Sequence, residues 1–277
     1  MEKKKTILIP WDFTEKAEYA FAHAARIAKI SEHSVTLIHI IADESERTLM
    51  EKSMSDEVKR LKDKFGVEPR FDIRYGDIFN TINNVSYELD AEMVIMGTHG
   101  IKGMQKVTGS WALKVIIGSH VPFIVVQGPP KNDKITNIIV PLTYKREDKE
   151  KIKWSYQFFK YFKTKVYIVH PTFKDSWLRK SMAGNIRFVK NFFDGCKVDY
   201  EIHTIVQRND LYNYSLNLAR EVQAELIMIL VRRHLSWTGY AMGPEEQYMI
   251  ANPLGVPVMC INPKPGKVTG SFSSTGG

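Results

Sequence analysis

The chain has 277 residues, of which 44% are hydrophobic, so it is long enough for two ordinary domains with sizeable cores. Every apolar run is shorter than the roughly 18–20 residues of a membrane span, and the run after the basic start MEKKK is too short for a signal-peptide core. The two cysteines, Cys196 and Cys260, are too few for a disulfide framework. These features disfavour membrane-spanning and disulfide-stapled secreted classes, and we expect a cytoplasmic protein.

The net charge of +8 is unevenly distributed along the chain. Residues 1–130 contain 17 Lys and Arg against 18 Asp and Glu, a net charge of −1, and residues 131–277 contain 22 against 13, a net charge of +9. Any attraction to an anionic partner therefore belongs mainly to the second half. The basic residues are dispersed and form no recognised nucleic-acid motif, which favours a solvated basic surface over nucleic-acid binding.

Short apolar runs alternate with amphipathic patterns along the first half. Apolar residues at helical spacing predict one helix within 13–28 and a charged, more exposed helix over 49–65. The same spacing predicts a third helix over 78–89, with Asp77 as its N-cap. Aliphatic runs predict strands at 7–10, 35–41, 69–74, 93–96 and 122–126. Such strands, separated by helices, are typical of parallel sheets buried on both faces.

The second half repeats the first at an offset of about 131 residues. The corresponding pairs are TILIPWDFTEK with NIIVPLTYKRE, VTLIHI with VYIVHP, AEMVIMGTHG with AELIMILVRR, and SHVPFIVVQGP with LGVPVMCINPK. The sequence therefore predicts two tandem domains, 1–130 and 131–265, followed by a Gly/Ser-rich flexible tail at 266–277. Each domain is expected to be an open, doubly wound α/β fold with a five-stranded parallel sheet.

The last apolar strand of each repeat predicts how the two domains pack. VPFIVV at 121–126 and VPVMCI at 256–261 are too apolar to be left as bare sheet edges. Antiparallel pairing of these two strands would cover both edges and join the domains as an intramolecular pseudo-dimer. A further homodimer of the whole chain is left open.

The doubly wound fold predicts a ligand site beyond the carboxyl ends of its strands, where the strand order reverses. Between the fourth strand and the next helix, the stretch MGTHGIKGMQKVTGS contains several glycines. Bare backbone N–H groups before a helix N-terminus favour an anion such as phosphate. The alternative is that the glycines only form turns and that Ser110 only caps the helix. The loop matches neither a Walker sequence nor the dinucleotide fingerprint.

Three segments together resemble the universal stress protein family. They are PWDF after the first strand, MGTHG after the fourth, and GSWALKVI followed by VPFIVV. Nucleotide-binding members of that family have G-x2-G-x9-G-[ST] at this place. Here eight residues separate Gly100 from Gly109, so the loop is one residue shorter. The resemblance covers both halves and implies a tandem member of the family.

The resemblance implies a role for each residue of a nucleotide site. Asp12 would contact the ribose, and the alternative is that it only caps the helix near Thr14. Core packing is the alternative for Ile40 and Met96. The residues that would border the adenine are Pro10, Ile40 or Ile41, and Met96, with Trp11 counted in the same strand-end motif. The phosphates would contact Gly97, Gly100, Gly109, Ser110 and the amide of Trp111.

The second repeat lacks this set of residues, so we expect its site to be degenerate. Thr143 stands opposite Asp12, and LVRRHLSWTGYAMGPEEQ replaces the glycine loop. His39 and His170 recur at the end of the second strand of each repeat, which indicates a shared structural role. No spacing of His, Cys and Asp predicts a metal site.

The leading functional hypothesis is a stress-response regulatory module that binds ATP or AMP, with or without Mg²⁺, in its first domain. We do not expect an enzyme, because only Asp12 and His99 are candidates for ATP hydrolysis and neither has an evident partner. A slow ATP hydrolase is one alternative. The other is a nucleotide-independent adaptor whose basic second domain docks a protein partner that the sequence does not identify. Neither hypothesis involves a membrane.

Overall fold

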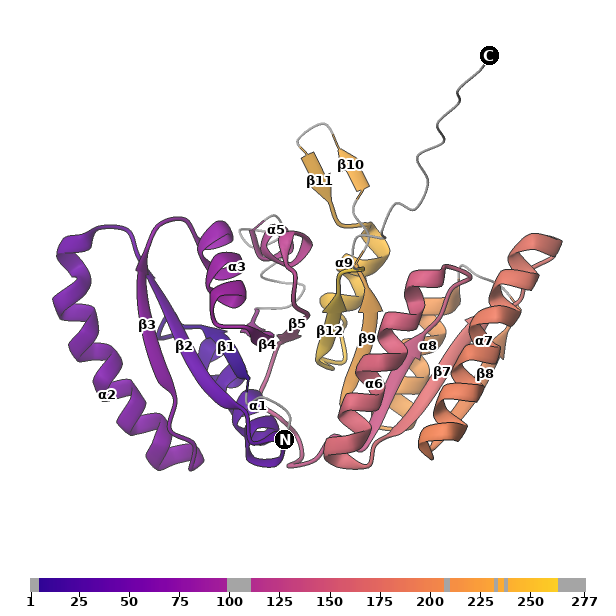
Figure 1. Cartoon of the computed structure of the whole chain (residues 1–277), viewed down its shortest axis with the longest axis horizontal. Helices are drawn as coiled ribbons and strands as arrows, with labels where there is room; N and C mark the ends of the chain where they lie inside the picture. The colour runs from indigo at the N-terminus through magenta and orange to yellow at the C-terminus, as the bar shows by residue number, and fades with distance from the viewer. Residues whose placement is uncertain (1–4, 99–110, 207–209, 232–233, 237–238, 264–277) are drawn as a thin grey trace, which may run out of the picture.

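The structure of the protein is a computed structural model that describes residues 5–98, 111–206, 210–231, 234–236 and 239–263 (Figure 1). The first half contains strands β1 (Thr6–Pro10), β2 (Ser34–Ile41), β3 (Arg70–Tyr75), β4 (Ala91–Gly97) and β5 (Phe123–Val126). Its helices are α1 (Glu15–Ser31), α2 (Arg47–Phe65), α3 (Ile78–Glu88) and α5 (Trp111–Gly118). The predicted tail at 266–277 lies outside the described residues.

The second half repeats this order of elements. Its strands are β6 (Asn137–Pro141), β7 (Lys165–Pro171), β8 (Tyr200–Ile205), β9 (Leu226–Leu230) and β12 (Val258–Ile261). Its helices are α6 (Lys149–Phe162), α7 (Ser176–Cys196), α8 (Leu211–Glu221) and α9 (Pro244–Ile250). A small antiparallel hairpin of β10 (His234–Ser236) and β11 (Gly239–Ala241), which was not predicted from the sequence, precedes α9.

Within the described residues, the strands outside the hairpin form one ten-stranded sheet with the order β3-β2-β1-β4-β5-β12-β9-β6-β7-β8. Pairing is parallel inside each half, as predicted. β5 and β12 are the one antiparallel pair of this sheet, with Val125 opposite Val258 and Phe123 opposite Cys260. The predicted joining of the two last strands is therefore confirmed, and each half keeps the doubly wound order.

Helices cover both faces of the sheet because successive strand residues point to opposite sides. Ile7 and Ile9 belong to the core that also contains the buried faces of α1, α2, α6 and α7. Leu8 belongs to the second core, with residues of α3, α5, α8 and α9. Figure 1 shows how the two halves continue one another across β5 and β12. No helix in the described part of the chain is long and apolar enough to cross a bilayer.

Local sequence signals explain where the helices of the first half begin and end. The hydroxyl of Thr14 caps α1 by accepting a hydrogen bond from the amide of Ala17. The carboxylate of Asp77 accepts from the amides of Phe79 and Asn80, so the predicted N-cap of α3 is confirmed. Gly66 ends α2 with a positive φ of 69°, a conformation that glycine adopts without strain.

A buried polar cluster holds the linker between the two halves. Arg26 Nη1 donates to the carbonyl of Asn132 at 2.9 Å, and Arg26 Nη2 donates to Nδ1 of His23 at 3.0 Å. Because Nδ1 of His23 accepts this hydrogen bond, Nε2 carries the proton of the neutral ring. Nε2 donates it to the carbonyl of Gly128 at 3.1 Å. On the other side, the carboxylate of Glu225 accepts from Asn132 Nδ2 at 2.7 Å. Residues of both halves therefore fix the linker.

Candidate functional site

A pocket of about 260 Å³ lies at the carboxyl ends of β1, β2 and β4. The strand order reverses between β1 and β4, so the pocket lies at the switch point of the first sheet half, as the sequence predicted. Helix α3 and helix α5 form its outer wall. The predicted site residues that line it are Pro10, Trp11, Asp12, Ile40, Met96 and Gly97. Predicted residues as far apart in the sequence as Pro10 and Gly97 thus meet at one place.

Among the other predicted site residues, Ile41 lies away from this pocket. Ile41 is 1% exposed and packs in the core on the α1 side of the sheet. Ile40 and Ile41 differ because neighbouring residues of a strand point to opposite faces, and Ile40 is the one beside the pocket. Trp111 is the first residue of α5. Gly100, Gly109 and Ser110, together with His99, lie outside the described residues.

Asp12 is exposed, and its carboxylate orders the turn between β1 and α1. Asp12 Oδ1 accepts hydrogen bonds from the amide of Thr14 at 3.1 Å and from its hydroxyl at 2.6 Å. The helix cap itself is Thr14, so the capping role weighed for Asp12 is indirect. Asp12 Oδ2 makes no hydrogen bond within the described residues, and a carboxylate at this position is an acceptor for ligand hydroxyl groups.

Trp11 has a largely structural role in the pocket. Its ring is 3% exposed and packs edge-to-face against Phe21 with centroids 6.5 Å apart. Its amide donates to the carbonyl of Ile38 at 2.8 Å, and its carbonyl lies 2.8 Å from Nδ1 of His39. These contacts hold the end of β1 against β2, which places the adjoining Asp12 at the pocket.

Gly97 lies where the end of β4 crosses the first turn of α1. A Cβ atom at this position would lie 2.1 Å from the carbonyl oxygen of Lys16 and 2.5 Å from its carbonyl carbon. Both neighbours are backbone atoms, which cannot swing aside. Close approach of protein backbone therefore requires glycine here, in addition to any approach by a ligand.

Sequence reasoning missed several residues that line the pocket. Ile78 and Ile82 lie on the apolar face of α3, which the helical pattern had identified only as a packing surface. Val115 of α5 completes this apolar wall. Lys16 brings a cation to the pocket from the first turn of α1, where no motif pointed to it. Only the crossing of α1 over β4 could have revealed that position.

At the corresponding strand ends of the second half, the polar groups are hydrogen-bonded or ion-paired with other residues of the protein. Thr143, which stands opposite Asp12, is 4% exposed. Its amide donates to the carboxylate of Asp148, and its carbonyl accepts from Asn185 Nδ2 at 2.9 Å. Asp148 and Lys151 form a buried ion pair at 3.1 Å. An exposed acceptor equivalent to Asp12 is therefore absent from this position among the described residues.

The two recurring histidines make different contacts, although a shared role was expected. His39 lies beside the Trp11 carbonyl. The Nε2 atom of His170 lies 3.1 Å from the hydroxyl of Thr204, and burial lowers the pKa of this imidazole. The two repeats share a backbone hydrogen bond just after the first strand of each. The amide of Leu142 donates to the carbonyl of Val169, as the amide of Trp11 donates to the carbonyl of Ile38.

The fold and the pocket define a doubly wound α/β protein with a ligand site at the switch point of its first half. Residues 4–127 match the universal stress protein family, so the first half of the chain is a domain of this family. Over 143 residues the chain is 28% identical to Universal stress protein MJ0531 of Methanocaldococcus jannaschii, which covers 46% of this chain and 84% of that protein.

Two solved structures resemble the chain over nearly its whole length. The crystal structure of a universal stress protein from Archaeoglobus fulgidus aligns with a TM-score of 0.74 and 15% identity, covering 95% of this chain and all of that one. A putative universal stress protein from Pseudomonas aeruginosa aligns with a TM-score of 0.65 and 14% identity, covering 94% of each chain. At these identities the likeness establishes the fold, which extends over both halves.

Proposed function

We propose that the first half of the chain binds an adenine nucleotide, ATP or AMP, as a regulatory ligand of a stress-response protein. The observation that carries this proposal is the meeting of Asp12, Ile40 and Met96 in one pocket at the switch point. These residues come from three strand ends and supply the two surfaces that a nucleoside needs. Ile40 and Met96 provide apolar contact for a flat base, and Asp12 accepts hydrogen bonds from the ribose.

The size of the pocket supports a division of the ligand between two parts of the site. A volume of about 260 Å³ suits a base with its sugar better than a whole nucleoside triphosphate. The phosphates would then extend toward α5 and the glycine-containing stretch before it, as the family motif implies. Lys16 lines the same pocket and adds a positive charge that favours an anionic ligand.

Binding without efficient turnover is the proposed activity. Within the described ranges, no group of three or more His, Cys, Asp and Glu side chains is arranged to hold a metal ion. A Mg²⁺ ion would therefore arrive with the phosphates of ATP, which often supply most of its non-water ligands. Efficient hydrolysis also needs a positioned water and stabilisation of transition-state charge, and the titratable side chains in the described lining of the pocket are Asp12, Lys16 and His39.

A regulatory role is supported by a physical connection from the pocket to the second half. Lys16 Nζ donates to the carbonyl of Gln127 at 3.4 Å. The side-chain amide of Gln127 in turn donates to the carbonyls of Ile250 and Asn252, at 3.1 and 3.2 Å. A phosphate that drew Lys16 toward the pocket would loosen the first of these contacts, so the nucleotide and the junction between the halves would be linked.

The most direct test is to identify what the protein carries when it is purified. Freshly isolated protein would be denatured, and the released small molecules would be identified by mass spectrometry. We expect ATP or AMP in an amount that falls strongly in the Asp12→Ala variant. Protein that releases no nucleotide and gives no heat on titration with ATP or AMP would favour the nucleotide-independent adaptor. Nucleotide hydrolysis at many turnovers per minute would instead favour the enzyme.

A further inference from the structure

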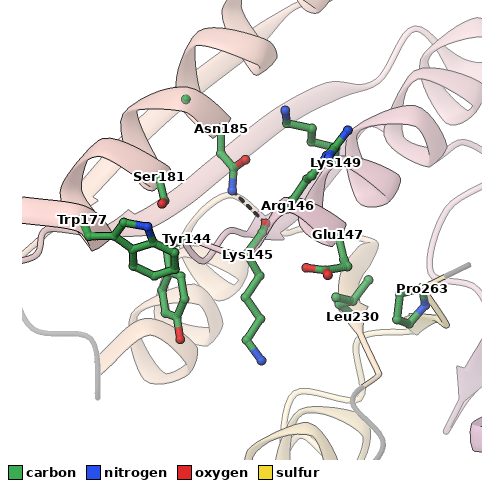
Figure 2. A pocket seen from close by; sticks show the side chains of 11 residues that line it. Tyr144, Lys145, Arg146, Glu147, Lys149, Trp177, Ser181, Asn185, Leu230 and Pro263 are labelled. Carbon is green, nitrogen blue, oxygen red and sulfur yellow. Dashed lines mark hydrogen bonds between the residues drawn. The ribbon is translucent and has the colours of Figure 1, made fainter. Parts of the chain in front are cut away.

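The second half contains a larger hollow at the carboxyl ends of its own strands, on the face of the sheet opposite to the first-half pocket. The hollow has a volume of about 660 Å³ and lies between the loop after β6 and helix α7 (Figure 2). Leu230, at the end of β9, closes one side. Because α7 covers the face that packs with α6, this hollow is distinct from the nucleotide pocket of the first half, which α3 and α5 border.

Two aromatic side chains form one wall of the hollow. The rings of Tyr144 and Trp177 meet edge-to-face with centroids 5.9 Å apart, and Phe173 supports Tyr144 at 5.6 Å. Trp177 is nevertheless 65% exposed. A large exposed indole beside a cavity is a common feature of ligand sites, since it offers a flat apolar surface that water does not solvate well.

Cationic side chains lie next to this wall. Lys145 and Arg146 both line the hollow, and neither makes an ion pair or a side-chain hydrogen bond within the part of the chain that the structure describes. Figure 2 shows the Lys145 side chain extending between the aromatic pair and Glu147. The lining of the hollow contains three cations, Lys145, Arg146 and Lys149, against the one carboxylate of Glu147, so it combines a flat apolar surface with a net positive charge.

Buried side chains hold the loop that bears these groups in place. Asn185, which is 4% exposed, donates from Nδ2 to the carbonyls of Thr143 and Lys145, at 2.9 and 2.8 Å. Figure 2 marks the contact with Lys145. The buried pair of Asp148 and Lys151 fixes the other end of the loop. A site whose backbone is already ordered loses less conformational entropy when a ligand binds.

We propose that this hollow binds a small aromatic anion, with a planar ring against Trp177 and Tyr144 and a phosphate group beside Lys145, while Arg146 adds positive charge from the same loop. The N-terminus of α7 does not serve as the anion site, because Asp175 already caps it. A net charge of +9 in the second half draws such anions toward this side of the molecule. The same chemistry is found in free nucleotides and in other aromatic phosphates.

Fluorine NMR of protein labelled with fluorotryptophan tests this proposal. The chain has five tryptophans, and the Trp177→Phe variant assigns the resonance of Trp177. The probes are phenyl phosphate, inorganic phosphate and phenol, each at equal ionic strength. We expect phenyl phosphate to shift the Trp177 resonance in a saturable way, with inorganic phosphate and phenol each binding at least about tenfold more weakly. Uridine monophosphate that binds more tightly than phenyl phosphate would identify a nucleotide as the source.

Substitution separates the proposed contacts from general charge attraction. The Lys145→Gln/Arg146→Gln double variant should weaken phenyl phosphate by about tenfold or more, while Lys190→Gln, an exposed cation elsewhere on α7, should change little. The single Arg146→Gln variant serves if the double variant does not fold. The proposal is overturned if phenyl phosphate leaves the Trp177 resonance unshifted. Equal binding of phenyl phosphate by the Lys145/Arg146 and Lys190 variants would also overturn it.

Discussion

The α-carbon of Gly97 faces the carbonyl group of Lys16 so closely that a Cβ atom would lie 2.1 Å from the Lys16 oxygen. This contact joins the end of β4 to the first turn of α1, two of the segments that form the first-half pocket. It requires glycine at the very position where the family motif begins. The spacing between the two segments is therefore set by the protein backbone before any ligand binds.

Gly97→Ala should reduce the free energy of unfolding by about 3 kcal/mol, because the added methyl group overlaps backbone atoms that cannot move independently. Urea unfolding followed by circular dichroism would measure this change. Gly128→Ala is the matched control, since a Cβ atom there meets nothing within 4 Å. Equal stability of the two variants would show that the close approach is not present in solution.

Much of this fold could be predicted from the sequence because its signals are local. The strands of the first half were predicted within two residues of their bounds, and the Asp77 cap was confirmed. The meeting of Asp12, Ile40 and Met96 follows from topology, since parallel strands end at the same edge of a sheet. Their role with a nucleotide stays a prediction.

Features that depend on packing between distant segments could not be predicted. Lys16 reaches the pocket only because α1 crosses β4, and its sequence neighbours give no sign of this. The hollow beside Trp177 depends on the buried Asn185, whose amide links two segments about 40 residues apart. The β10–β11 hairpin has short strands whose polar sequence lacks a clear alternating pattern.

The stability of the protein should fall in mild acid because of His23. Burial, followed by the nearby charge of Arg26, lowers the pKa of this imidazole to about 3. The unfolded chain takes up a proton below a pKa of about 6.5 whereas the folded protein does not, so stability is full above that value and is lost as the pH falls toward 3. At about pH 5 the expected loss from this group is about 2 kcal/mol.

Urea unfolding of the wild type and of His23→Gln between about pH 7 and pH 5 would measure this contribution. The variant should be less stable at pH 7 but should lose about 2 kcal/mol less than the wild type on going to pH 5. Parallel losses in both proteins would mean that His23 is not the group responsible.

The junction of the two halves should contribute strongly to stability through the apolar side chains of β5. Ile124, opposite Met259 and 2% exposed, fills the core between the halves. Ile124→Ala should lower the free energy of unfolding by about 3 kcal/mol, which thermal or urea denaturation would record. Leu49→Ala, at a side chain that is 64% exposed, should change it by less than about 0.5 kcal/mol. Comparable effects would argue against the β5–β12 junction.

The Asp12 carboxylate should contribute to the binding of every ligand that contains the ribose. Asp12→Ala is expected to weaken ATP, AMP and adenosine by a similar factor of about ten, because a charged acceptor for the sugar hydroxyl groups is lost. Calorimetric titration with the three ligands measures this. Asp43→Ala, which removes an exposed carboxylate that caps a neighbouring turn outside the pocket, is the control. Selective weakening of ATP alone would place Asp12 near the phosphates instead.

The number of nucleotides bound per chain decides whether the first half alone contains the nucleotide site. Calorimetric titration of the intact protein with ATP and with AMP would give this stoichiometry. We expect one site per chain that binds both ATP and AMP and requires Asp12, because the counterpart of Asp12 in the second half is the buried Thr143. Any binding of these nucleotides at the Trp177 hollow would be a second, non-equivalent site. Two equivalent sites per chain, or binding that persists unchanged in Asp12→Ala, would contradict this expectation.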